Sequence, residues 1–194
     1  MPRIIPLESH RFIAAAALFS VLGWAATGDI VARGVGNFHQ VDAHIYRGAQ
    51  PTRLGIQSLA KFGIKTVIDL REGREHAGVE EKLVKAVGMR YVNVPMKGLS
   101  APTKEQMAKV LALLDDSSGW PVFVHCRRGA DRTGTVIACY RISHERWANQ
   151  KALEEARLFG MSWVERAMQH YILSFAAPKP EIPQSGLKPL PASP

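Results

Sequence analysis

The residues best suited to catalysis lie in one stretch, PVFVHCRRGADRTG, at positions 121–134. A short apolar run ends at His125, and a loop of six residues leads to a helix predicted to begin near Arg132. Backbone N–H groups that converge at a helix N-terminus bind anions, and the planar guanidinium of Arg132 could hold two phosphate oxygens. Gly129 permits the backbone angles that such a turn requires. The spacing therefore predicts a phosphate cradle between a strand and a helix.

Cys126 opens this predicted cradle. We expect the helix dipole, the loop amides and Arg132 to stabilise its thiolate, which is the nucleophilic form of cysteine. Thr133 can donate a hydrogen bond to the sulfur, which would ease its departure when a covalent intermediate is hydrolysed. His125 is expected to orient the loop through a hydrogen bond to the backbone.

The segment resembles the signature of the protein tyrosine phosphatase superfamily, which is His, Cys, five residues, Arg, then Ser or Thr. In this chain the matching residues are His125, Cys126, Arg132 and Thr133. Upstream, residues 46–51 (YRGAQP) and 63–71 (GIKTVIDLR) are similar to the opening of small bacterial dual-specificity-type phosphatases. The resemblance covers residues 37–175. It implies a cysteine-dependent phosphatase domain that forms a phosphocysteine at Cys126, without a metal or a cofactor.

The general acid departs from the superfamily pattern. The superfamily usually supplies an Asp from a mobile loop before the nucleophile, but the corresponding residues 95–103 (PMKGLSAPT) contain no carboxylate. Some members carry Asp just before the signature Arg, so the resemblance makes Asp131 the predicted acid. The alternative role for Asp131 is an acceptor that orients the loop. The alternative acid is Asp69, for which pairing with a nearby Arg is the competing prediction.

Basic side chains are expected around the pocket. Arg127 and Arg128 occupy the variable positions of the loop, while Lys97 and Arg71 come from loops at the same edge of the sheet. Such a rim fits a phosphoinositide, an inositol polyphosphate or an acidic phosphopeptide, and phosphotyrosine stays open. The alternative for each charge taken singly is a solvated surface position. The predicted catalytic residues are Cys126, Arg132, Asp131 and Thr133. The predicted substrate-binding residues are His125, Arg127, Arg128, Gly129, Ala130, Lys97 and Arg71.

The elements that must position these residues alternate along the chain. Apolar patterns predict strands at residues 41–47, 66–70, 89–94 and 122–125. They predict helices at residues 52–62, 75–87, 102–114, 132–143, 149–159 and 163–175, the third capped by Ser100. We therefore expect a single α/β domain of the protein tyrosine phosphatase type. Its mostly parallel sheet is flanked by helices, and its site lies at the carboxyl ends of the strands.

The two ends of the chain differ from the middle. Residues 12–26 form an uncharged apolar run behind a short basic start, which favours a signal peptide or membrane anchor over residues 1–32. The domain is then expected in a bacterial membrane or periplasm rather than the cytoplasm, although a buried first helix is the alternative. Residues 178–194 hold six of the twelve prolines and are predicted to be a disordered tail.

Composition narrows the remaining choices. The net charge of +8 comes without a Lys/Arg run of the kind that binds nucleic acid, so we expect no nucleic-acid partner. Cys126 and Cys139, with a helix between them, are predicted not to form a disulfide, and two cysteines are too few for a structural zinc site. We expect a monomer. The alternative functions are a membrane-tethered phosphate-binding pseudophosphatase and sulfur or arsenate chemistry at Cys126.

Overall fold

The computed structural model describes residues 34–177, without the side chains of residues 74–77. The predicted anchor at residues 1–32 and the predicted tail at 178–194 lie outside the described residues. Within the described part of the chain, no helix is long and apolar enough to cross a membrane.

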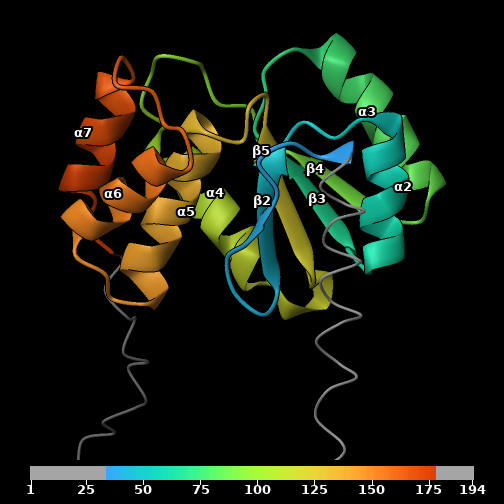
Figure 1. Cartoon of the computed structure of the whole chain (residues 1–194), viewed down its shortest axis with the longest axis horizontal. Coiled ribbons are helices and arrows are strands. Elements are labelled where there is room, and N and C mark those ends of the chain that lie inside the picture. Colours follow the sequence, from blue (N-terminus) through green and yellow to red (C-terminus); the bar gives the residue numbers. More distant parts are fainter. Residues whose placement is uncertain (1–33, 178–194) are drawn as a thin grey trace, which may run out of the picture.

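A five-stranded sheet forms the centre of the domain (Figure 1). Its strands stand in the order β1-β2-β5-β3-β4, and only the β1–β2 pair is antiparallel. The bounds are β1 His39–Gln40, β2 Ile45–Ala49, β3 Thr66–Asp69, β4 Arg90–Asn93 and β5 Val122–Cys126. The predicted mostly parallel sheet is confirmed, and its first predicted strand is a short hairpin.

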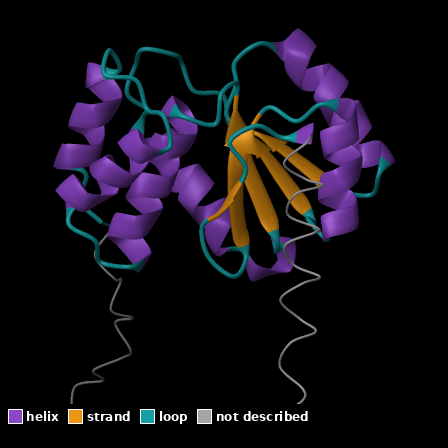
Figure 2. Cartoon of the chain, in the orientation of Figure 1, coloured by secondary structure: helices purple, strands orange, loops and turns teal. Residues whose placement is uncertain are grey.

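Helices cover both faces of the sheet (Figure 2). One face carries α2 Arg53–Phe62 and α3 Arg74–Ala86, and the other carries α4 Lys104–Asp115 and α5 Asp131–His144. Two further helices, α6 Asn149–Leu158 and α7 Arg166–Ser174, pack on α5 through a small apolar cluster of their own. All six predicted helices are present, with ends that shift by a few residues.

Local signals explain where the helices start and stop. Thr52 accepts a hydrogen bond from the Gly55 N–H at the start of α2, and Gly63 ends that helix at a φ of 102°, which suits glycine. The predicted cap of α4 was wrong. Thr103, not Ser100, is the cap, because its hydroxyl and the Gln106 side chain bond each other's backbone in a capping box.

Strand alternation decides which helices each site residue faces. Successive side chains of a strand point to opposite faces of the sheet. In β5, Val124 and Cys126 belong to the core between the sheet and helices α4 and α5, whereas Phe123 belongs to the core on the α2 and α3 side. His125 has the parity of Phe123 and is in register with Asp69 of β3. The side chains of the predicted nucleophile Cys126 and of His125 therefore lie on opposite faces of the sheet.

Candidate active site

The loop between β5 and α5 has its carbonyl groups held from outside. The Cys126 carbonyl lies 3.2 Å from Nδ1 of His125, and because a carbonyl only accepts, that nitrogen must carry the hydrogen. The Arg127 carbonyl accepts from the Gln50 N–H at 3.3 Å. The Gly129 carbonyl accepts from Nη2 of Arg47 at 2.8 Å. The predicted hydrogen bond from His125 to the backbone is therefore present.

The amide groups of this loop face the other way. In a planar trans peptide the C=O and the N–H point in opposite directions, so carbonyls held outward turn the following N–H groups inward. No backbone or side-chain acceptor within residues 34–177 takes the N–H groups of residues 128–130. The loop therefore presents unpaired donors at the N-terminus of α5, which is the arrangement that binds an oxyanion.

Cys126 lies at the base of this loop and is 1% exposed. Thr133, the third residue of α5, is also fully buried, and its hydroxyl has no hydrogen-bond partner in the described part of the chain. The bond from Thr133 to the sulfur therefore stays a prediction. Cys126 and Cys139 are both free thiols, as predicted. Burial raises the pKa of the Cys139 thiol, which keeps that second cysteine protonated and inert.

A cavity of about 580 Å³ opens beside the loop. Its lining consists of Gln50, Arg71, Glu72, Gly98, Arg127 and Arg132. Arg132 is partly buried, and its Nη1 donates to the Met96 carbonyl at 3.3 Å. Lys97 is exposed beside the lining residue Gly98. Three of the predicted basic residues, at positions 71, 127 and 132, are thus brought to one cavity.

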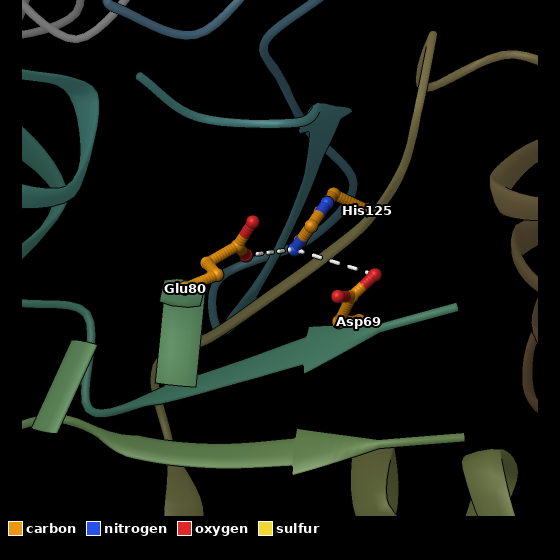
Figure 3. Close-up of side chains that lie close together, drawn as sticks. All are labelled: Asp69, Glu80 and His125. Carbon is orange, nitrogen blue, oxygen red and sulfur yellow. Dashed lines mark ion pairs between the residues drawn. The ribbon is translucent and has the colours of Figure 1, made fainter. Parts of the chain in front are cut away.

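A buried ion network lies behind the loop, on the α3 side of the sheet (Figure 3). Arg71 donates to both oxygens of Asp69, at 2.9 and 2.6 Å, and to Glu80 at 2.6 Å. Nε2 of His125 lies 2.7 Å from Glu80 and 3.9 Å from Asp69. The network therefore joins the sheet, α3 and the residue before the nucleophile.

Asp69 is held as a carboxylate by this network. Burial opposes its ionisation, but hydrogen bonds from Arg71 and Tyr91 and the nearby His125 hold the pKa of Asp69 below its usual value. Pairing with a nearby Arg, the competing prediction for Asp69, is confirmed. The oxygen and nitrogen atoms of Asp69, Glu80 and His125 are close enough to hold a cation, but Arg71 already forms an ion pair with each carboxylate. Arg71 lines the cavity, but its Nε and Nη2 donors are taken by Asp69 and Glu80.

Comparison with known proteins agrees with this geometry. Residues 21–172 match the family described as "DSP-PTPase phosphatase fused to NAD+ Kinase". The chain belongs to this family of dual-specificity-type phosphatases. It is 32% identical over 126 residues to OCA1 of Mycosarcoma maydis, covering 63% of this chain and 79% of that protein. It is 28% identical over 124 residues to the dual specificity protein phosphatase TpbA of Pseudomonas aeruginosa strain UCBPP-PA14, covering 64% of this chain.

Solved structures place the chain in the same fold. A crystal structure of P. aeruginosa TpbA superposes with a TM-score of 0.61 at 26% identity, covering 70% of this chain and 83% of that one. A Cys-to-Ser variant of TpbA in complex with phosphotyrosine gives a TM-score of 0.62 at 25% identity, covering 71% and 83%. The phosphatase nevertheless spans only about half the length of the full TpbA sequence. The predicted superfamily, fold and enzyme class are confirmed.

Asp131 of this phosphatase has both carboxylate oxygens engaged. Oδ2 accepts from Nη2 of Arg128 at 2.6 Å, and Oδ1 accepts from the Ser162 N–H at 2.9 Å. The Arg128 side chain is 61% exposed, so the ion pair alone contributes only about 0–1 kcal/mol. The bond to Ser162, however, ties the loop to the segment between α6 and α7. These contacts favour the orienting role for Asp131 over the predicted role of general acid.

Sequence reasoning gave no role to three residues around this site. Arg47 stands in the YRGAQP motif, which was its only signal, and Glu80 lies among the polar residues of α3 with nothing to distinguish it. Glu165, just before α7, is 7% exposed. Burial, then the charge of Asp131, raises the pKa of Glu165, while the Leu99 backbone and nearby arginines act in the opposite direction. Its position in the chain, 34 residues after Asp131, gives no sign that the two side chains interact.

We predict that Asp131→Asn lowers the hydrolysis of alkyl and aryl phosphates by similar factors. The amide disturbs the bonds to Arg128 and Ser162 whatever the leaving group is. Steady-state kinetics with both ester types would measure this, with Asp115→Asn as a control at the opposite end of the sheet. A loss of about 10²–10⁴ confined to alkyl esters would instead restore Asp131 as the acid.

Proposed function

We propose that this chain hydrolyses phosphomonoesters through a phosphocysteine at Cys126. One observation carries the proposal: a buried thiol stands at the base of a loop whose inward N–H groups have no acceptor within residues 34–177, and Arg132 lines the cavity beside this loop. The relatives with phosphatase names support the same reaction class. The free hydroxyl of Thr133 and the His125 contact to the Cys126 carbonyl supply the accessory groups that this chemistry uses.

The reaction proceeds in two displacements at phosphorus. The Cys126 thiolate attacks, an S–P bond forms, and the bond from phosphorus to the ester oxygen breaks. The released oxygen takes a proton from water. Water then attacks the phosphocysteine, the S–P bond breaks, and inorganic phosphate departs while the thiolate is restored. The loop amides and Arg132 stabilise the charge on the non-bridging oxygens in both transition states. Thr133 stabilises the sulfur as it leaves.

The substrate class follows from the donors that remain free in the cavity. Arg132 is needed for the transferred phosphoryl group, whereas Arg127 is exposed in the same lining, and Lys97 stands exposed nearby. A second anionic group on the substrate could pair with Arg127. We therefore place phosphoinositides and inositol polyphosphates ahead of a simple phosphotyrosine peptide. One relative carries a name of this kind, the inositol diphosphatase DSP1 of rice. Another, the phosphatidylglycerophosphate phosphatase PTPMT2 of Arabidopsis thaliana, is named for a different phospholipid.

The N-terminal segment suggests where the phosphatase works. The uncharged run at residues 12–26 follows Arg3 and Arg11, a pattern that directs export or anchors a protein with its domain outside the cytoplasm. We propose that residues 1–32 place the domain at a membrane or in the periplasm. The proposal rests on the sequence alone.

Replacement of the nucleophile tests the function. We expect Cys126→Ser to lower turnover of p-nitrophenyl phosphate by ~10³ or more while inorganic phosphate still binds, because the backbone donors survive. Cys139→Ala is the matched control, since it removes the other buried thiol, and it should keep its activity. Turnover that persists in Cys126→Ser, with phosphate release measured directly, would refute the proposal.

Removal of one cavity charge tests the substrate class. We expect Arg127→Ala to lower kcat/KM for an inositol polyphosphate about tenfold, the size of one charge-assisted hydrogen bond, and to change p-nitrophenyl phosphate hydrolysis less than twofold. Lys61→Ala removes an exposed charge on α2 and controls for net charge. Equal effects of Arg127→Ala on both substrates would contradict the preference for polyanions.

Cell fractionation tests the location. We expect the full chain, expressed in a bacterium, in the membrane or periplasmic fraction, and a chain that lacks residues 1–32 in the cytosol. Immunoblotting of the fractions with a cytosolic marker protein would measure this. Recovery of the full chain from the cytosol with an intact N-terminus would exclude export and anchoring.

A further inference from the structure

Arg47 is buried more completely than an isolated charge should be. The residue is 1% exposed, and its Nε and Nη1 atoms have no hydrogen-bond partner within residues 34–177. Its guanidinium carbon lies 4.5 Å from the centre of the Phe159 ring, and burial lowers the pKa of Arg47 to about 10. A buried guanidinium with unmet donors is costly, so an apolar side chain would serve stability better. The presence of an arginine at this buried position must therefore be explained by the hydrogen bond that its Nη2 donates.

That donor holds the carbonyl of Gly129. Nη2 of Arg47 donates to it at 2.8 Å, and Nδ2 of Asn37 donates to the same oxygen at 3.1 Å. Asn37 also donates to the Phe159 carbonyl at 3.0 Å, and it adopts a φ of 51°, a left-handed conformation that asparagine tolerates well. Asn37, Arg47 and Phe159, which we call the loop anchor, therefore converge on one peptide group of the catalytic loop.

This peptide group needs such a restraint. Gly129 has a φ of 69°, and a glycine can reverse the following peptide plane at little steric cost. The loop also lies directly against β2, since a Cβ on Gly129 would fall 2.3 Å from the Gly48 carbonyl carbon. With the Gly129 carbonyl held outward by two donors, the Ala130 N–H on the same peptide plane points into the cradle.

We propose that Arg47 is a positioning residue of the catalytic loop, which keeps the Ala130 amide aimed at the bound phosphoryl group by holding the Gly129 carbonyl. The assignment rests on the proposed function, because that function is what places a phosphoryl group in the cradle. Arg47 bonds the loop at the Gly129 carbonyl, on the side away from the cradle, so it acts on the phosphoryl group through the loop rather than by direct contact.

Phosphate binding in the Cys126→Ser protein tests this role without turnover. We expect Arg47→Met, which keeps the length of the side chain and removes its donors, to weaken inorganic phosphate binding at least tenfold by calorimetry. Arg47→Lys restores one donor and should fall between Arg47→Met and the parent. In the protein with Cys126 intact, Arg47→Met should lower kcat and raise KM together.

The matched control is Arg141→Met. Arg141 also stacks on an aromatic ring, Trp147 at 4.8 Å, and pairs with Glu155, but it does not contact the loop. It should leave phosphate affinity within twofold. A purely structural role for Arg47 would lower the midpoint of urea unfolding and leave the phosphate affinity of the folded protein unchanged, which would overturn the proposal.

A second variant covers the case in which Arg47→Met does not fold. Asn37→Asp keeps the shape and the backbone preference of Asn37 but cannot donate to the Gly129 carbonyl, so it should weaken phosphate binding as well. Unchanged affinity there would refute the anchor. If esters are not hydrolysed but Arg47→Met still weakens phosphate binding, the proposed function fails and the anchor stands. If hydrolysis is confirmed and Arg47→Met leaves the phosphate affinity unchanged, the positioning role of Arg47 is refuted while the proposed function stands.

Discussion

The direction of the peptide groups between Cys126 and Ala130 is the constraint on which this site depends. An amide can point into the cradle only if its carbonyl partner is accommodated outside it, and each buried carbonyl needs a donor. Three parts of the fold supply those donors: the His125 ring from β5, the Gln50 N–H after β2, and the side chains of Asn37 and Arg47 from the N-terminal hairpin region. The parallel sheet matters to the chemistry because it brings the ends of these segments to one edge.

The ion network on the α3 face extends this constraint into the core. Burying a carboxylate or a guanidinium costs several kcal/mol, which only close mutual pairing offsets. Asp69, Arg71, Glu80 and His125 meet that condition by sharing partners, with Tyr91 as a further donor to Asp69. The same pairing fixes the His125 ring, and the ring in turn fixes the Cys126 carbonyl. A charge cluster far from solvent thereby determines the orientation of the first peptide in the loop.

The sequence was sufficient to predict those features that depend on local patterns of residues. The loop signature, the alternation of strands and helices and the glycine that ends α2 all depend on residues close together in the chain, and the structure contains each of them. It failed where long-range partners decide. Nothing near Asp131 in the sequence indicates that the Ser162 amide, 31 residues away, takes one of its oxygens. Arg71 lines the cavity as predicted, but its ion pair with Glu80 was missed, because Glu80 lies on a helix whose rotation the sequence does not fix. The cap of α4 was misplaced by three residues because Ser100 and Thr103 are both good caps, and only the reciprocal bond to Gln106 distinguishes them.

The arginines around the site show why a count of basic residues does not describe the field in the cavity. Arg71 and Arg128 are paired with carboxylates, and Nη2 of Arg47 donates to the Gly129 carbonyl. Arg127 and Arg132 line the cavity and have no such ion pair within residues 34–177, so they are the charges best placed to attract a substrate. Since residues 95–103 hold no carboxylate and both oxygens of Asp131 are occupied, the proposed reaction depends strongly on this attraction. In the proposed reaction, electrostatic stabilisation of the phosphoryl oxygens acts on every ester, so the basic leaving oxygen of an inositol phosphate takes its proton from water rather than from Asp131.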